Sequence, residues 1–252
     1  MHKYKKYLGQ NFLFDKNVIN KIIKAVKPQK TDTFVEIGPG QGALSLPLSK
    51  SVSKLVVIEK DKTLLKSLKR ELMGNSVIIN SDILKTNLCD YVEEEIRILG
   101  NLPYNISTEI IFKIILDNLK IKDVHFMLQR EVVDRIVSNP GGKQYGRISV
   151  MCQTYYKVNK LFDIPPTVFF PQPKVWSSYI KLIPRRNIFL NEEHEKNFKN
   201  IVNLAFISRR KMLKTSLKKV IKLNDLCRII KDPSVRPEQL TSDDFLELSK
   251  YV

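Results

Sequence analysis

Cysteine, histidine and long apolar runs are scarce in this chain of 252 residues, and each scarcity removes a class of protein. The three cysteines, Cys89, Cys152 and Cys227, lie far apart without a CxxC pair, so neither a disulfide framework nor a zinc site is predicted. The three histidines are equally scattered, and we expect no bound metal. No apolar run reaches the ~18 residues that a transmembrane helix needs, so none is expected.

The first residues also lack the features of a signal peptide. Residues 1–6 are basic, but no apolar segment follows them. Because the cysteines show no disulfide pattern either, the reducing cytoplasm is the predicted compartment.

Acidic residues are outnumbered, 26 against 43 basic ones, which leaves a formal net charge of +17. Such an excess predicts a polyanionic partner, either a nucleic acid or an acidic membrane surface. Residues 1–30 carry eight lysines and a single acid, Asp15, and residues 208–222 carry seven basic residues and no acid. These two segments are candidates for the walls of one binding groove.

Short apolar runs alternate with helical patterns, which predicts an α/β fold with a doubly wound parallel sheet. Asp15 is the expected N-cap of the first helix. After residue 186 the pattern is helical only, so we expect a catalytic domain at 1–186 and a small all-helical domain at 187–252. The predicted strands are 33–37, 54–58, 77–80, 97–100, 124–128, 158–164 and 175–183, and the remaining predicted helices begin near 43, 62 and 107.

A glycine-rich loop follows the first predicted strand. Gly38, Gly40 and Ala43 match the dinucleotide fingerprint G-x-G-x-x-A, and Glu59 lies 21 residues beyond Gly38, so an NAD-dependent dehydrogenase is one candidate. Glu36 disfavours it, because an acid before the glycines would crowd a pyrophosphate. That acid suits a cationic ligand such as S-adenosylmethionine, which carries a sulfonium and an ammonium group.

Polar side chains stand at the ends of the next three strands. Glu59 is placed to bind ribose hydroxyls, Asp82 to accept from an adenine amine, and Asn101 to face the reacting centre. Solvated carboxylates are common at strand ends, so the prediction rests on the four successive positions and not on one acid.

The segment Asn101–Asn105 stands where a buried strand ends and a helix begins, the usual mouth of a site in an open α/β sheet. The Asn101 side chain and the Leu102 carbonyl offer acceptors for an exocyclic amine, Pro103 stiffens the turn, and Tyr104 supplies a flat wall for a base. The alternative is an ordinary turn with a core tyrosine.

These motifs and five others together resemble the ribosomal RNA adenine dimethyltransferase family over nearly the whole chain. Arg209–Lys211 and Arg236–Leu240 favour its small-subunit branch over the macrolide-resistance methylases, whereas Trp176 departs from the residue usual there. The further matching segments are Gly9–Leu13, Tyr145–Val150, Pro171–Val175, Ala205–Lys211 and the extension of the asparagine motif to Thr108.

The resemblance implies a Rossmann-like S-adenosylmethionine-dependent methyltransferase that dimethylates N6 of two adjacent adenines near the 3′ end of small-subunit (16S) rRNA, with S-adenosylhomocysteine as product. It implies that rRNA or an immature small subunit is the partner of a cytoplasmic monomer without membrane contact. The implied cofactor contacts are Asn11, Leu13, Gly38, Gly40, Glu59, Asp82 and Asn101. The implied catalytic residues are Asn101, Leu102, Pro103 and Tyr104, with Tyr104 and Phe169 stacking on the target base.

The predicted RNA contacts are Arg147, Arg209, Arg210, Lys211, Lys214 and Lys218. The alternative for the Arg209–Lys211 segment is a solvated helix face. A non-catalytic RNA-binding factor with the same fold is a further alternative, which the intact asparagine motif disfavours.

Overall fold

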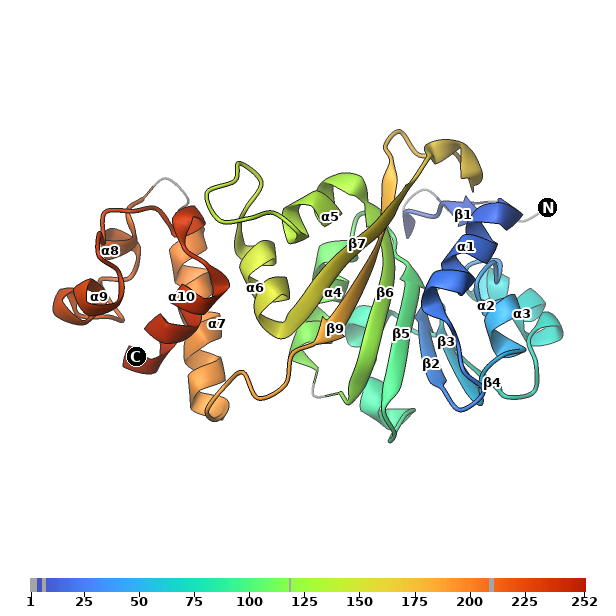
Figure 1. Ribbon diagram of the computed structural model, residues 1–252. Coiled ribbons are helices and arrows are strands. Elements are labelled where there is room, and N and C mark those ends of the chain that lie inside the picture. Colours follow the sequence, from blue (N-terminus) through green and yellow to red (C-terminus); the bar gives the residue numbers. More distant parts are fainter. Residues whose placement is uncertain (1–3, 6–7, 118, 209–210) are drawn as a thin grey trace. The chain divides into compact units, whose positions relative to one another are not determined.

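The computed structural model describes residues 4–5, 8–117, 119–208 and 211–252 (Figure 1). The chain divides into two compact units: unit 1 comprises Met1–Val133 and Asn159–Ile183, and unit 2 comprises Asp134–Val158 and Pro184–Val252. The predicted boundary after residue 186 lies close to Pro184, where the chain enters unit 2 for the second time.

Residues 134–158, expected in the first domain, are grouped with the C-terminal helices instead. The Tyr155 hydroxyl donates a hydrogen bond to Glu195 at 2.8 Å, and the Gly141 N–H donates to the Glu238 carbonyl at 2.7 Å. These contacts join segments that are far apart in sequence, and no local pattern could have indicated them.

In the described part of the chain, seven strands form one sheet in the order β4-β3-β2-β5-β6-β9-β7. The first five of these strands pair in parallel, and β9 is antiparallel to β6. The strands are β2 (Thr33–Ile37), β3 (Lys54–Ile58), β4 (Ser76–Ile79), β5 (Ile96–Asn101), β6 (Ile121–Gln129), β7 (Tyr156–Ile164) and β9 (Ser177–Pro184). All seven predicted strands are confirmed, as is the doubly wound α/β fold.

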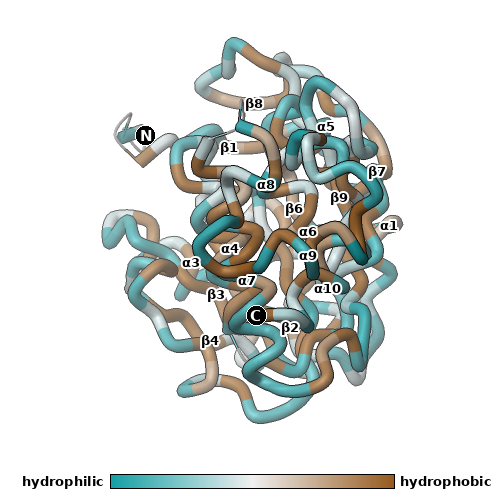
Figure 2. Tube along the Cα trace, turned by 90° about the vertical axis from the view of Figure 1, so that its left-hand side faces the viewer, coloured by the Kyte–Doolittle hydropathy of each residue, from teal (hydrophilic) through white to brown (hydrophobic). Residues whose placement is uncertain are grey.

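Helices cover both faces of this sheet, with α1 in front and α4 behind in Figure 1. Helix α1 begins where predicted, since the Asp15 carboxylate accepts from the Val18 N–H at 2.9 Å. It buries Ile22 and Val26 against Phe34 of β2, while α4 is brown over most of its length in Figure 2, as its apolar sequence requires. The helices of unit 1 are α1 (Lys16–Val26), α2 (Ser45–Ser49), α3 (Leu65–Glu71) and α4 (Ser107–Leu116), and α5 (Arg130–Ile136) begins in unit 1 and ends in unit 2.

A buried ion-pair network fastens the amino end of β5. The Arg97 guanidinium donates two hydrogen bonds to Asp123, at 2.7 and 2.9 Å, and one to Asp32 at 2.8 Å. A buried arginine with this many acceptors is well compensated for its lost hydration. The network holds the amino end of the strand whose carboxyl end carries Asn101.

In the described residues of unit 2 the regular structure is helical, apart from the first residues of β7 and the last residue of β9. Its core includes Tyr145, Phe198 and Phe245, all fully buried. The helices are α6 (Arg147–Tyr155), α7 (Glu192–Ile207), α8 (Leu213–Ser216), α9 (Leu223–Ile229) and α10 (Ser242–Leu248). The predicted helical C-terminal region is confirmed. None of the helices described is long and apolar enough to cross a membrane.

Candidate active site

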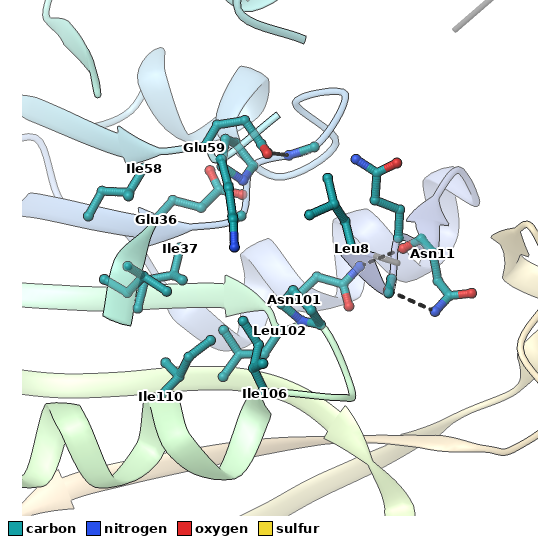
Figure 3. A pocket seen from close by; sticks show the side chains of 18 of the residues that line it. Leu8, Asn11, Glu36, Ile37, Ile58, Glu59, Asn101, Leu102, Ile106 and Ile110 are labelled. Carbon is teal, nitrogen blue, oxygen red and sulfur yellow. Dashed lines mark hydrogen bonds between the residues drawn. The ribbon is translucent and has the colours of Figure 1, made fainter. Parts of the chain in front are cut away.

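A pocket in unit 1 opens at the carboxyl ends of β2, β3 and β5, the edge where ligands bind in open α/β sheets (Figure 3). Ten residues predicted for the site line this one pocket: Asn11, Leu13, Gly38, Gly40, Glu59, Asp82, Asn101, Leu102, Pro103 and Tyr104. Glu36 lines it too. The residues meet because parallel strands end at the same edge.

The glycine loop after β2 leaves its backbone open to a ligand. Gly38 and Gly40 have φ values of +70° and +59°, in the left-handed region that favours glycine. A Cβ on Gly40 would lie 3.0 Å from the Phe12 ring, so a side chain would also displace that ring. The Gly40 N–H donates to Glu59 at 3.1 Å, which closes the loop onto the end of β3.

Two acidic side chains, Glu36 and Glu59, lie beside each other in this pocket (Figure 3). Burial, with a smaller contribution from the charge of Glu59, raises the pKa of Glu36 to about 7, against a 2.5 Å hydrogen bond from the Ser45 hydroxyl that lowers it. Burial also raises the pKa of Glu59, against hydrogen bonds from the Asp61 and Gly40 N–H groups. A cation in the pocket would favour the charged form of both acids.

Asp82 differs from these acids in its surroundings. A 2.8 Å hydrogen bond from the Lys60 ammonium lowers the pKa of Asp82, and the Leu84 N–H adds a second bond at 3.0 Å. This carboxylate is therefore charged at neutral pH, and its oxygens act as acceptors.

The Asn101 side chain is held in one orientation by the N-terminal segment. Its Nδ2 donates to the Asn11 carbonyl at 2.9 Å (Figure 3). A carbonyl oxygen only accepts hydrogen bonds, so the NH2 group of the Asn101 side chain, and not its Oδ1 atom, must face Asn11. The Oδ1 atom of Asn101 consequently remains available to a donor on the ligand.

Sequence reasoning missed the anchor that holds this N-terminal segment. Asp61 is buried and accepts from the Lys5 ammonium at 2.7 Å and from the Gln10 side chain at 2.9 Å, and Gln10 in turn accepts from the Lys5 N–H at 2.7 Å. Burial alone would raise the pKa of Asp61, but the hydrogen bonds from Lys5, Thr63 and Gln10 outweigh it and hold that pKa well below its usual range. We call Lys5, Gln10 and Asp61 the clasp.

Opening the clasp should slow the reaction without unfolding unit 1. In Gln10→Ala the segment loses its bond to Asp61, so Asn11 holds Asn101 less firmly, and we expect roughly tenfold slower turnover through misplacement of Asn101. Hydrogen exchange should speed up at the amides of residues 8–13 and stay unchanged in α1. Gln29→Ala, an exposed glutamine of unit 1 that does not line the pocket, is the matched control. Unaltered exchange at 8–13 would contradict the role of the clasp.

Tyr104 also has a partner that the sequence did not indicate. Its hydroxyl and that of Ser177, the buried first residue of β9, lie 2.6 Å apart. Burial raises the pKa of Tyr104, and the bond to Ser177 opposes that rise. The ring is therefore fixed at the pocket and its hydroxyl is neutral at physiological pH.

Phe169, predicted to stack on the target base, lies in the core and is only 2% exposed. The short strands β1 (Phe12–Leu13) and β8 (Phe169–Phe170) pair antiparallel, with Leu13 opposite Phe169 and Phe12 opposite Phe170. Because side chains alternate along a strand, the first pair faces the core and the second faces outward. In this structure the exposed ring at the position is Phe170, and Phe169 does not line the pocket.

The predicted RNA contacts that the structure describes all belong to unit 2. Arg147, Lys211, Lys214 and Lys218 are exposed. Arg209 and Arg210 lie outside the described residues. The grouping of 134–158 with the C-terminal helices places Arg147 in the same unit as the basic segment.

The strand order and the pocket at the carboxyl ends define a Rossmann-like methyltransferase fold, and solved structures share it. A dimethyladenosine transferase from Plasmodium falciparum is 26% identical, with a TM-score of 0.79 over 94% of this chain and 95% of that one. The 23S rRNA methyltransferase ErmE shares the fold at 22% identity, with a TM-score of 0.75 over 96% of this chain and 99% of its own.

The sequence comparisons give the family. A model described as ribosomal RNA adenine dimethylase matches residues 1–252. Ribosomal RNA small subunit methyltransferase A of Legionella pneumophila is 41% identical over 100% of this chain and 98% of its own length, and that of Francisella tularensis is 42% identical over 99% and 98%. The chain belongs to the ribosomal RNA adenine dimethylase family.

Family membership confirms the prediction of an rRNA adenine dimethyltransferase enzyme and decides between the candidates left open by the glycine loop. The fingerprint Gly38-x-Gly40-x-x-Ala43 belongs here to a methyltransferase and not to an NAD-dependent dehydrogenase.

Proposed function

We propose that this enzyme transfers methyl groups from S-adenosylmethionine to N6 of two adjacent adenines near the 3′ end of small-subunit rRNA. The observation that carries the proposal is the orientation of Asn101, whose Oδ1 is left as an acceptor in a pocket that also holds Glu36, Glu59 and Asp82. This set of acceptors and acidic groups fits a cationic nucleoside cofactor beside an amine-bearing base.

The cofactor would lie across the ends of β2 to β4. Gly38 and Gly40 allow close approach of the backbone, and Glu36 compensates the positive charge of the cofactor. Glu59 binds the ribose hydroxyls with the lone pairs that Gly40 and Asp61 leave, and Asp82 accepts from the adenine amine of the cofactor. From the N-terminal segment, Asn11 and Leu13 cover it.

The target adenine would lie against the turn after β5. Its amine is a poor nucleophile, because its lone pair is delocalised into the ring. Two acceptors, Asn101 Oδ1 and the Leu102 carbonyl, draw its two hydrogens into a geometry that aims the lone pair at the methyl group. Pro103 stiffens the turn, and the Tyr104 ring stacks on the flipped-out base. The alkylated amine then loses its proton to water, so no strong base is required.

The decisive experiment offers small ribosomal subunits that lack the modification, or their rRNA, together with methyl-labelled S-adenosylmethionine. We expect mass spectrometry to find N6,N6-dimethyladenosine at two adjacent positions near the 3′ end of the rRNA. Parallel titration with NAD should show no binding. Label on another base, or at a single isolated adenine, would overturn the proposal.

The RNA would bind through positive charge on unit 2. The exposed side chains Arg147, Lys211, Lys214 and Lys218 supply phosphate contacts there, and the charges of Arg209 and Arg210 add to them. We further propose a cytoplasmic monomer, without membrane contact, that acts on rRNA or on an immature small subunit.

Cofactor affinity should depend on pH through Glu36. With a pKa of about 7, Glu36 is largely protonated at about pH 6 and must lose that proton to compensate a cation, so affinity should rise with pH up to about 7 and then level off. The rise is at most about tenfold per pH unit. Calorimetry between about pH 5.5 and 7.5 measures it. Glu36→Gln should flatten the profile, whereas Glu71→Gln, an exposed residue of α3, should not; an equally steep profile in Glu36→Gln would refute this role.

A further inference from the structure

An exposed phenylalanine stands at the rim of the active-site pocket and has no role in the chemistry above. Phe170 is 62% exposed. It lies opposite Phe12 in the β1–β8 pair, on the outward face of that pair, and Phe12 lines the pocket. Side chains directly opposite each other on one face lie about 5 Å apart at Cβ, so Phe170 extends the pocket wall outward.

Tyr4 steadies this ring from one side. The two ring centroids lie 6.1 Å apart with an interplanar angle of 86°, an edge contact that favours one orientation of the Phe170 ring. The ring is thus exposed at the pocket rim and already held in one orientation, as a stacking surface for a ligand requires.

The charge of the surrounding segments indicates what that ligand is. Residues 4–14 and 165–176 contain no acidic residue, and the second segment carries the exposed Lys174. A phosphate backbone can approach such segments without repulsion, and every nucleobase offers an apolar face to an aromatic ring. An acid-free rim with one open ring is thus suited to a nucleotide of the RNA.

We propose that Phe170, supported by Tyr4, forms a stacking subsite for the nucleotide adjacent to the target adenine. The inference rests on the proposed function, since a flipped adenine in the pocket leaves its covalent neighbour at the rim. With two adjacent target adenines, the base in this subsite is the other adenine in one of the two transfers. Phe170 thereby contributes to RNA binding and to the register of the two transfers.

Phe170→Ala tests the subsite, with Phe170→Trp as the conservative variant. Stacking on one aromatic ring contributes about 1–3 kcal/mol per base, so we expect the KM for RNA to rise by roughly fivefold to a hundredfold in the alanine variant and to stay near the original value with tryptophan. The affinity for S-adenosylmethionine should not change. Tyr91→Ala is the matched control, because Tyr91 is a partly exposed aromatic residue near Lys54, at the amino end of β3, the opposite edge of the sheet.

The fluorescence of a base analogue reports stacking directly, and it would not change if Phe170 only stabilised the fold. With 2-aminopurine in place of the neighbouring adenine, binding should quench the fluorescence in the original protein and in Phe170→Trp, and markedly less in Phe170→Ala. Full quenching in Phe170→Ala, or a loss of cofactor affinity instead of RNA affinity, would overturn the subsite. If the original protein methylates no RNA, the proposed function fails; if it does and Phe170→Ala matches it in KM and quenching, only the subsite fails.

Discussion

Replacing Asn101 by alanine should slow methyl transfer by about 10²-fold or more, the size of effect seen when one preorganised polar group is lost at a reacting centre. The variant loses the acceptor Oδ1 that we assign to the adenine amine. It also frees the Asn11 carbonyl, which accepts from Nδ2 at 2.9 Å. Single-turnover methylation at saturating RNA and cofactor measures the rate of the chemical step.

A second substitution separates the two functions of this amide. Asn101→Asp keeps an acceptor but cannot donate to Asn11, so its carboxylate meets a carbonyl oxygen and its orientation is lost. We expect it to be nearly as slow as the alanine variant, with RNA affinity barely changed in both. Asn20→Ala, an exposed asparagine on α1, serves as the control. Single-turnover rates equal to the original in Asn101→Ala would show that the role given to Asn101 is wrong.

Replacing Glu59 by alanine should weaken S-adenosylmethionine binding by at least about tenfold, since a hydrogen bond to a charged group contributes roughly 1.5–3 kcal/mol. The loss has two sources. The ribose would lose its acceptor, and the glycine loop would lose the bond from the Gly40 N–H to Glu59 at 3.1 Å. Calorimetry on a variant whose thermal unfolding remains cooperative gives the affinity.

Glu59→Gln separates the contribution of the charge from that of the acceptor oxygen. It keeps one acceptor oxygen, so it can retain either the loop contact or the ribose contact but removes the charge. We expect an affinity between those of the original protein and of Glu59→Ala. Glu71→Ala, on the exposed end of α3, should bind the cofactor normally. Unchanged affinity in a folded Glu59→Ala would remove Glu59 from the cofactor site.

Much of the pocket could be predicted from local sequence. Glu36, Glu59, Asp82 and Asn101 follow or end strands that apolar runs already indicated, and the structure brings all four to one pocket. The reason is topological: parallel strands present their carboxyl ends at the same edge, so position along each strand is enough to place a residue at the site. The cofactor and base contacts of these residues remain predictions that the experiments above address.

The chemistry-bearing residue types, the alternation of strands and helices and the helical C-terminal region were therefore determined by the sequence alone, because each depends on neighbours within a few residues. Only the tertiary structure decided the rest. Gln10 and Asp61 are 51 residues apart, and Tyr104 and Ser177 are 73 apart. The β1–β8 register decided that Phe169 is buried and Phe170 exposed, and packing on the C-terminal helices decided where residues 134–158 belong. Such contacts depend on which surfaces meet after folding, and no local pattern of residues encodes that.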